Sequence, residues 1–315
     1  MRYRVLGRTG LRVSELSLGA ARGARSSPQE FVAVVSACLE AGINLVDTAA
    51  GYDGGESERT LGRALEGRGD VLVETKYCPY ESYLPAAAYV GSPAALVASA
   101  EESLRRLRRD HVDVFLGHGI RSLSTLGRFM ADGCYEAMLK LKEQGKARFI
   151  GLSELSEADG THEVLREAVP SGAFDVVMLT LNFLLQTAAE SLLPLCAERG
   201  VGTVVMMPMN QASRQSGLVS VPAALECIRR HVRQGSLPAG APYDDPSLLD
   251  FLAPYPLPEA ALRYVLLHDV SSCCVGMSSP GRLRDNLKAV DPPYLDPARL
   301  RRLRELFGRI RVQQR

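Results

Sequence analysis

The chain has 315 residues, of which 46% are hydrophobic and 23% charged, and this composition is typical of a globular protein with a large core. The 37 Lys and Arg residues nearly balance the 36 Asp and Glu residues, so the formal net charge of +1 offers no field that would attract nucleic acid or an acidic membrane surface. We therefore expect neither nucleic acid nor a membrane among its partners.

No leader or membrane span is expected. The opening MRYRVLGRTGLRVSELSLG alternates apolar and polar residues and lacks the continuous apolar region of a signal peptide, and no later run approaches membrane-spanning length. The seven cysteines show no CxxC spacing and mostly lie in apolar runs, which is typical of buried thiols in a reducing compartment. These features predict an unprocessed cytoplasmic protein.

In chain order, the first expected element is a β-hairpin over residues 2–13, where RYRVLGRTGLRV places two glycines between short apolar segments. Eight apolar segments follow, each typical of a buried parallel strand. They cover residues 14–20, 43–49, 71–76, 112–119, 147–153, 175–182, 201–208 and 271–277.

The segments between these strands have the apolar periodicity of amphipathic helices, and several end at Gly beside a basic residue. They cover residues 28–42, 56–67, 93–110, 134–146, 162–169, 188–200, 258–269 and 280–290. Residues 295–315 predict one more amphipathic helix, packed on the outside of the protein.

Eight consecutive βα units favour a closed barrel over an open sheet, because closure leaves no edge strand to protect. Length alone allows one domain or two, but the uninterrupted repeat indicates one. We therefore expect an α/β fold: a (β/α)8 TIM barrel that forms a single domain over residues 1–315, with an N-terminal β-hairpin cap and an extra C-terminal helix.

Two irregular stretches, residues 77–91 and 210–258, interrupt the repeat. Both follow strands at the C-terminal mouth of the barrel, where barrel enzymes carry their chemistry, so we expect them to be substrate-gating loops. The first stretch is rich in tyrosine, and its tyrosines either line a substrate pocket or pack their own loop. These tyrosines are Tyr77, Tyr80, Tyr83 and Tyr89.

Four polar residues fall at the C-terminal ends of three successive predicted strands. Asp47 and Tyr52 follow the second strand, Lys76 ends the third and His118 ends the fourth. A lysine buried at a strand end needs an anion, which Asp47 supplies, and a cation beside a tyrosine lowers the phenol pKa from its usual value of about 10. Tyr52 would then serve as a general acid-base, while His118 orients a carbonyl oxygen toward it.

Each of these residues also has an ordinary structural explanation. In that interpretation Asp47 would cap the following helix, Tyr52 would lie on a loop surface, Lys76 would be a strand-end charge and His118 would be a core histidine. Their convergence on adjacent strand ends favours the catalytic interpretation. No metal is expected, because no group of His, Cys and Asp has ligand spacing.

Several of these segments resemble the aldo-keto reductase family from Tyr3 to about Val290. LGRTGLRVSELSLG resembles the opening of the family, INLVDTAAGYDGGESERTLGRAL the segment with its catalytic Asp and Tyr, VLVETK the segment with Lys, and DVFLGHGI the segment with His. LKEQGKARFIGLS, FDVVMLTLNFL and VGMSSPGRLRDNLKAV resemble a branch containing aldose and galactose dehydrogenases and iron-sulfur-linked relatives. The cysteine-rich tail of those last relatives is missing, so no cluster is implied.

The resemblance implies a nicotinamide cofactor held without the GxGxxG fingerprint, which follows none of the predicted strands. The start of the helix after the eighth strand suits a phosphate, because free N–H groups and the helix dipole favour an anion there. Position by position, the implied cofactor contacts are Ser153, Asn182 and Met206 at the nicotinamide, Gly276, Met277 and Ser278 at the phosphate, Arg282 at the 2′-phosphate or adenine, and Asn286 at the adenine.

Some positions depart from the pattern of the family. Glu154 stands where many members have Asn, Met178 replaces a Gln that contacts the nicotinamide amide, and Met206 replaces the aromatic residue that stacks on the ring. Gly276 replaces a basic residue of the 2′-phosphate motif, which leaves Arg282 as the main argument for NADP(H) over NAD(H).

Three functions are compatible with these residues. The first is an NAD(P)(H)-dependent oxidoreductase acting on a small-molecule carbonyl, alcohol or sugar. The second is an NAD-dependent sugar dehydrogenase that uses the same four residues, Asp47, Tyr52, Lys76 and His118 (the tetrad), to oxidise its substrate. The third is a nicotinamide-binding regulatory subunit with little turnover, against which the intact tetrad argues. Substrate identity and oligomeric state are not predicted.

Overall fold

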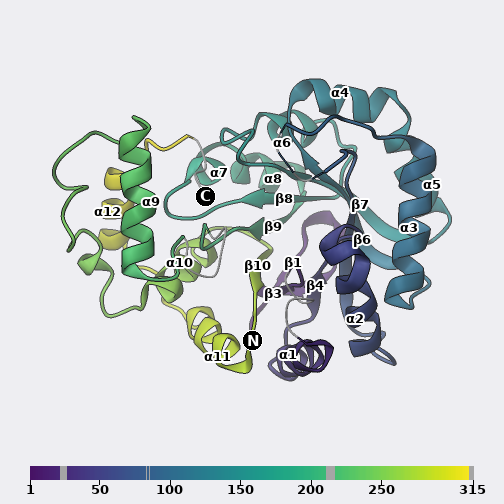
Figure 1. The fold of residues 1–315 in the computed structure, drawn as a ribbon, viewed down its shortest axis with the longest axis horizontal. Coiled ribbons are helices and arrows are strands. Elements are labelled where there is room, and N and C mark those ends of the chain that lie inside the picture. Colours follow the sequence, from purple (N-terminus) through teal and green to yellow (C-terminus); the bar gives the residue numbers. More distant parts are fainter. Residues whose placement is uncertain (22–26, 83, 85, 211–216, 312–315) are drawn as a thin grey trace.

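The computed structural model describes residues 1–21, 27–82, 84, 86–210 and 217–311. Eight parallel strands lie at its centre (Figure 1): β3 (Leu16–Gly19), β4 (Leu45–Asp47), β5 (Leu72–Tyr77), β6 (Val112–Ile120), β7 (Ala147–Glu154), β8 (Val176–Thr180), β9 (Gly202–Met206) and β10 (Ser272–Gly276). They close into a barrel in the order β10-β3-β4-β5-β6-β7-β8-β9. Each strand lies on a segment predicted as strand, so the predicted (β/α)8 barrel is confirmed.

The N-terminal hairpin closes one end of the barrel, as predicted. Its strands β1 (Tyr3–Val5) and β2 (Arg12–Ser14) pair antiparallel. The turn between them packs against the start of β9, where a Cβ at Gly7 would lie 2.3 Å from the Gly202 nitrogen. With its φ of +51°, Gly7 therefore allows a contact that a larger residue would block.

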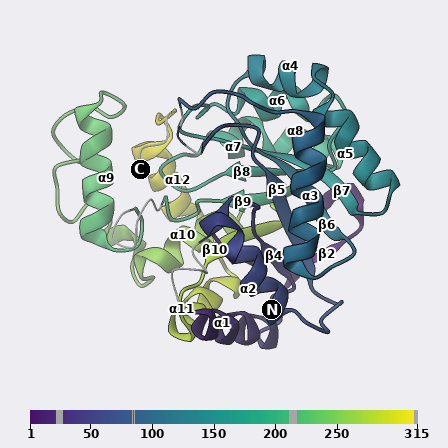
Figure 2. The ribbon, with the colours of Figure 1, turned by 45° about the vertical axis from the view of Figure 1, so that its right-hand side comes forward.

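Helices surround the barrel on the outside (Figures 1 and 2). Those predicted from the sequence are α1 (Pro28–Glu40), α2 (Glu56–Ala64), α3 (Pro93–Leu107), α5 (Cys134–Glu143), α6 (Glu163–Ala168), α7 (Thr187–Ser191), α8 (Leu193–Arg199), α10 (Leu257–Leu266), α11 (Pro280–Leu287) and α12 (Pro297–Phe307). The segment predicted as one helix over 188–200 is divided near Pro194, because proline has no N–H to continue the earlier helix. The extra C-terminal helix is confirmed as α12, and residues 312–315 of the segment predicted for it lie outside the described residues.

Two helices were not predicted, α4 (Leu123–Ala131) and α9 (Val221–Arg233). The interpretation of residues 210–258 as irregular is wrong for α9, which begins after a Ser220 side chain that accepts from the Ala223 N–H. Its buried face consists of Ala224, Leu225, Cys227, Ile228 and His231, which recur at helical spacing. Residues 211–216 lie outside the described residues.

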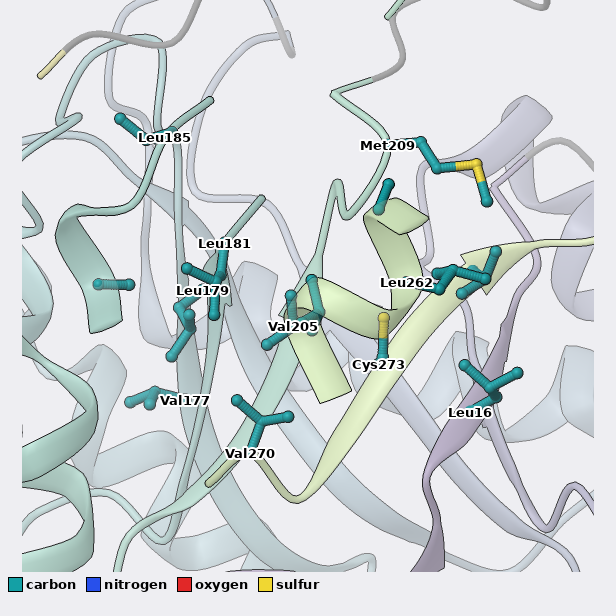
Figure 3. Close-up of a cluster of buried hydrophobic side chains, with 14 of the residues drawn as sticks. Leu16, Val177, Leu179, Leu181, Leu185, Val205, Met209, Leu262, Val270 and Cys273 are labelled. Atoms are coloured by element: carbon teal, nitrogen blue, oxygen red, sulfur yellow. The ribbon is translucent and has the colours of Figure 1, made fainter. Parts of the chain in front are cut away.

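The core has two layers. One fills the barrel interior and includes Leu45, Val114, Leu116 and Cys274. The other lies between the strands and the surrounding helices, and Figure 3 shows part of it, with Val205 of β9, Leu262 of α10 and Cys273 of β10. Cys273 and Cys274 thus point to opposite faces of β10, as alternation along a strand requires. None of the helices in the described ranges combines the length and apolar character needed to cross a bilayer.

Candidate active site

A cavity of about 520 Å³ opens at the C-terminal ends of the barrel strands. Its wall brings together most of the residues that the sequence singled out, from segments far apart in the chain. These are Asp47, Tyr52, His118, Met206, Gly276, Met277, Ser278, Arg282 and Asn286. The predicted convergence on one mouth of the barrel is therefore present in the structure.

Lys76 and Asp47 form a buried ion pair at the edge of this cavity. β4 and β5 are neighbours with Asp47 opposite Glu74, which places Lys76 one layer nearer the mouth. The Lys76 Nζ donates to Asp47 Oδ2 and, at 2.8 Å, to the Thr48 carbonyl. Burial opposes a charge on Lys76, but Asp47 raises the lysine pKa above its ordinary value, so the ammonium form persists.

Tyr52 lies beside this pair, on a 3₁₀ turn that follows β4. The Lys76 Nζ is 5.2 Å from the centroid of its ring. Burial raises the pKa of Tyr52 to about 12, although Lys76 acts in the opposite direction. The expectation that Lys76 brings this pKa below its ordinary value is therefore wrong, because the loss of hydration around the phenolate outweighs the attraction of one cation.

His118 faces Tyr52 across the mouth, with ring centroids 5.8 Å apart and ring planes at 77°. A register shift between β6 and β7 occurs at this point, and Gly119 takes a φ of +66°. Such an irregularity re-aims the side chains at a strand end. Burial and the charges of Lys76 and Arg121 hold the pKa of His118 well below its usual range, so its ring is neutral near pH 7.

Ser153 and Asn182 are fully buried and are not among the residues that line the cavity. The Ser153 hydroxyl accepts from the Gly119 N–H at 2.8 Å. The Asn182 side chain accepts from two backbone N–H groups, at 3.0 and 2.9 Å, and donates to the Met207 carbonyl at 3.2 Å. In the structure these side chains hold the strand ends, and their contact with a nicotinamide stays a prediction.

The opposite end of the cavity lies at the start of α11. The Ser279 side chain caps this helix by accepting from the Arg282 N–H at 3.2 Å. Arg282 is exposed, and its guanidinium makes no ion pair with any of the described residues. Asn286, one turn later, is buried against the cavity wall. A cation, a polar amide and a helix N-terminus thus lie together, which suits an anionic ligand with a polar ring.

Glu154 was identified from the sequence only as a departure from the pattern of the family. Its side chain is fully buried and forms an ion pair with His162 Nδ1 at 2.8 Å. It also accepts from the Thr180 N–H at 2.8 Å, so its carboxylate stabilises the protein behind the cavity wall. Glu154 is also one of the residues that line the cavity.

Arg121 is a wall residue that the sequence did not reveal. Its guanidinium lies 3.6 Å from the centroid of the Tyr80 ring and donates to the carbonyls of Ala87 and Ser82 at 2.8 and 2.9 Å. These contacts anchor the 77–91 loop to the end of β6. No spacing rule would have found this residue, because its partners are backbone atoms of a loop.

The tyrosines of the 77–91 loop pack the loop and do not line the cavity, as far as the structure describes them. Tyr80 and Tyr89 meet edge to face at 5.9 Å, and Arg128 lies over the Tyr89 ring at 4.3 Å. Tyr77 accepts from the Ser92 N–H at 3.4 Å. Tyr83 lies outside the described residues.

The described residues contain no group of three or more His, Cys, Asp or Glu side chains placed to hold a metal ion. The Asp47 carboxylate, which lines the cavity, is paired with Lys76.

Residues 15–307 match the Aldo/keto reductase family. The chain belongs to this family. Over 299 residues, which is 91% of this chain and 87% of the relative, it is 31% identical to L-galactose dehydrogenase of Arabidopsis thaliana. It is also 26% identical to the uncharacterized oxidoreductase YqkF of Bacillus subtilis (strain 168), over 96% of this chain and 95% of that one. The predicted resemblance is confirmed, and the chain is an oxidoreductase of the aldo/keto reductase type.

Solved structures of the family confirm the fold. The holo form of aldo-keto reductase AKR11C1 from Bacillus halodurans superposes with a TM-score of 0.78 and 28% identity, covering 100% of this chain and 99% of that one. The apo form of the same protein, aligned over the same shares, gives a TM-score of 0.67 and 26% identity.

Proposed function

We propose that this aldo/keto reductase is an NAD(P)(H)-dependent enzyme that moves a hydride between a nicotinamide and a carbonyl or alcohol, with Tyr52 as the general acid-base. The observation that carries the proposal is the buried Lys76–Asp47 pair beside Tyr52 and His118 at one side of a single cavity. Charged and acid-base groups that converge in a cavity in this way are typical of a catalytic centre.

The residues present fit a nicotinamide dinucleotide stretched across the barrel mouth. The bound cofactor would supply the hydride. Gly276, Met277 and Ser278, together with the N-terminus of α11, would hold its phosphates, and Arg282 and Asn286 would hold the adenosine end. Met206, Ser153 and Asn182 would border the nicotinamide end.

Tyr52 would deliver the proton. Because its pKa is raised to about 12, the residue is a phenol near neutrality and is ready to protonate the substrate oxygen during reduction. The neutral His118 would donate a hydrogen bond to the same oxygen and aim it at the phenol. Lys76 would stabilise the phenolate that forms, and Asp47 would keep Lys76 charged and in place.

We favour NADP(H) over NAD(H), because the exposed guanidinium of Arg282 offers a bidentate donor for a 2′-phosphate. The substrate would be a small carbonyl compound, alcohol or sugar. The 31% identity to an L-galactose dehydrogenase favours a second candidate, oxidation of a sugar with NAD. The seven free thiols support a reducing cytoplasm as the location.

The proposal is tested by titrating the purified protein with NADPH and NADH while following the fluorescence of the bound cofactor. Saturable binding, followed by turnover on a panel of aldehydes, ketones and sugars in both directions, is expected. Binding without turnover would favour a regulatory subunit. Absence of saturable binding for both cofactors would overturn the proposal.

A further inference from the structure

A second acidic side chain, Glu74, lies inside the barrel beneath the catalytic pair. It stands opposite Asp47 on β4 and Val114 on β6. Because side chains alternate along a strand, Glu74 points to the same side of β5 as Lys76, two residues later. Its side chain is completely buried, at 0% exposure.

The surroundings of Glu74 do not support a second negative charge. On the barrel interior its neighbours are the apolar Val114 of β6, Asp47 of β4 and Lys76 of its own strand, and the Cys274 thiol of β10 is close enough to feel its charge. The ionisable cluster thus holds one cation and two carboxyl groups. Two buried carboxylates around one ammonium would leave an uncompensated charge, which is costly in such a medium.

The hydrogen bonding of Glu74 agrees with a neutral acid. Neither carboxyl oxygen reaches a hydrogen-bond donor among the described residues. Asp47, directly opposite on the neighbouring strand, is the carboxylate available as an acceptor for a protonated Glu74. Burial, and then the charge of Asp47, raise the pKa of Glu74 well above its ordinary value, against the opposing effect of Lys76.

A second buried glutamate in the same barrel shows the opposite environment. Glu58 of α2 is also at 0% exposure, but it accepts from the Thr75 hydroxyl at 2.7 Å and from the Arg106 guanidinium at 3.2 Å. With two such donors its carboxylate is satisfied as an anion. Glu58 is therefore a matched control for burial without the chemistry of the cluster.

We propose that Glu74 is a positioning residue for proton transfer: a buried carboxylic acid that shares its proton with Asp47 and thereby sets how strongly Lys76 acts on Tyr52. As the acid, Glu74 donates a hydrogen bond to Asp47. This bond weakens the attraction between Asp47 and Lys76, so the ammonium group stabilises the phenolate of Tyr52 more strongly. As the anion, it would add a second negative charge and oppose that phenolate. This role rests on the proposed function of Tyr52, whereas the protonation state of Glu74 does not.

The protonation state is measured by infrared spectroscopy of the protein without cofactor. A protonated carboxylic acid has a carbonyl stretch that a carboxylate lacks. At neutral pH, we expect such a band in the wild-type protein and in Glu58→Gln, and its loss in Glu74→Gln. If Glu74→Gln fails to fold, the same band is sought in wild-type protein with isotope-labelled glutamate. Absence of a protonated glutamate at neutral pH would overturn the proposal.

The coupling to Tyr52 is measured by the ultraviolet absorbance of tyrosinate, as the difference between each protein and its Tyr52→Phe version. The proposed coupling requires that wild-type Glu74 lose its proton by the alkaline pH at which Tyr52 ionises. Glu74→Gln should therefore let Tyr52 ionise roughly one pH unit lower than in the wild type, and Glu58→Gln should not. An unchanged Tyr52 titration in Glu74→Gln would refute the role.

Neither measurement requires cofactor or turnover, so a failure of the proposed function would not be mistaken for a failure of this inference. Where turnover is found, the alkaline limb of the kcat profile should shift in Glu74→Gln by the same amount as the Tyr52 titration. The Kd for the cofactor should stay unchanged. A loss of affinity without a shift in the pH profile would indicate a structural role only and would overturn the proposal.

Discussion

The two sides of the barrel mouth differ in how their polar residues are used. At the ends of β4, β5 and β6, Lys76 is paired with Asp47, and Lys76 and His118 both lie against Tyr52. Asp47 raises the pKa of Lys76, while burial and the charge of Lys76 lower the pKa of His118. At the ends of β7 and β8, Ser153 and Asn182 bond to backbone groups of neighbouring strand ends and loops.

This difference follows from charge. A buried cation requires an anion, so the partners of a lysine at a strand end can be inferred from residue type alone. A neutral hydroxyl or amide is satisfied by any nearby N–H or C=O group, and many are available at a strand end. Residue type therefore predicts the contacts at the ends of β4, β5 and β6 (the acid-base side) better than those at the ends of β7 and β8.

The strongest test of the acid-base side is Tyr52→Phe, which removes a hydroxyl and little else. Turnover should fall about a hundred- to ten-thousand-fold, or roughly 3 to 5 kcal/mol of barrier, while the cofactor Kd barely changes. Steady-state kinetics and cofactor titration measure the two effects. Tyr77→Phe, at the end of β5 and outside the cavity wall, should keep normal turnover. Near-normal turnover in Tyr52→Phe would remove the basis for assigning the tetrad.

Lys76→Met should cost comparable turnover by another route, because the phenolate loses its cation and the buried Asp47 loses its partner. Breaking a buried pair also destabilises a protein, typically by about 3 to 5 kcal/mol, which urea denaturation would detect. The Tyr52→Phe/Lys76→Met double variant should be far from additive in kcat, because both changes disable one unit. Additive losses would mean that the two residues act separately.

Arg282→Ala tests the adenosine end. A charge-assisted hydrogen bond contributes about 1.5 to 3 kcal/mol, so NADPH affinity should fall roughly ten- to hundredfold, and NADH affinity much less. Arg284→Ala, exposed on the same helix but absent from the cavity wall, is the control and should leave both affinities unchanged. Equal losses for the two cofactors in Arg282→Ala would show that the residue only stacks on adenine.

The raised pKa of Tyr52, to about 12, predicts how the two directions respond to pH. Reduction uses the phenol, so kcat/KM for a carbonyl should be steady from neutral to moderately alkaline pH and fall only as pH approaches the pKa. Oxidation uses the phenolate, whose population rises about tenfold per pH unit below the pKa. Oxidation should therefore accelerate with pH. A plateau in oxidation near neutrality would show that the pKa in the enzyme is much lower.

Ser153→Ala gives the smallest effect. The Gly119 N–H loses its acceptor, so unfolding should become easier by about 1 kcal/mol, measured by urea denaturation. Cofactor affinity should fall less than in Arg282→Ala. An affinity loss as large as that of Arg282→Ala would show that Ser153 is a major contact of the nicotinamide. The ends of β7 and β8 would then bind ligand directly, as is proposed for the opposite side of the mouth.

The two irregular segments show the limits of prediction from the sequence. Residues 77–91 and 210–258 were recognised as interruptions of the repeat, but their local structure and contacts were not predicted. α9 was missed although its buried residues from Ala224 to His231 follow helical spacing and Ser220 caps its start, so this signal was present in the sequence. The anchoring of the 77–91 loop by Arg121 was missed because its partners are carbonyls and a tyrosine ring contributed by the folded loop.

The sequence by itself determined the eight strands, their closure into a barrel and the positions of Asp47, Tyr52, Lys76 and His118. Apolar runs and helical periodicity are local signals, and the chemistry of a buried charge narrows the choice of partner. Only the tertiary structure decided that burial keeps Tyr52 a phenol, that Ser153 and Asn182 hold strand ends, and that Glu74 lies under the catalytic pair. These properties depend on which groups face one another across the barrel and on how far water is excluded. Neither factor can be inferred from the order of residues along the chain.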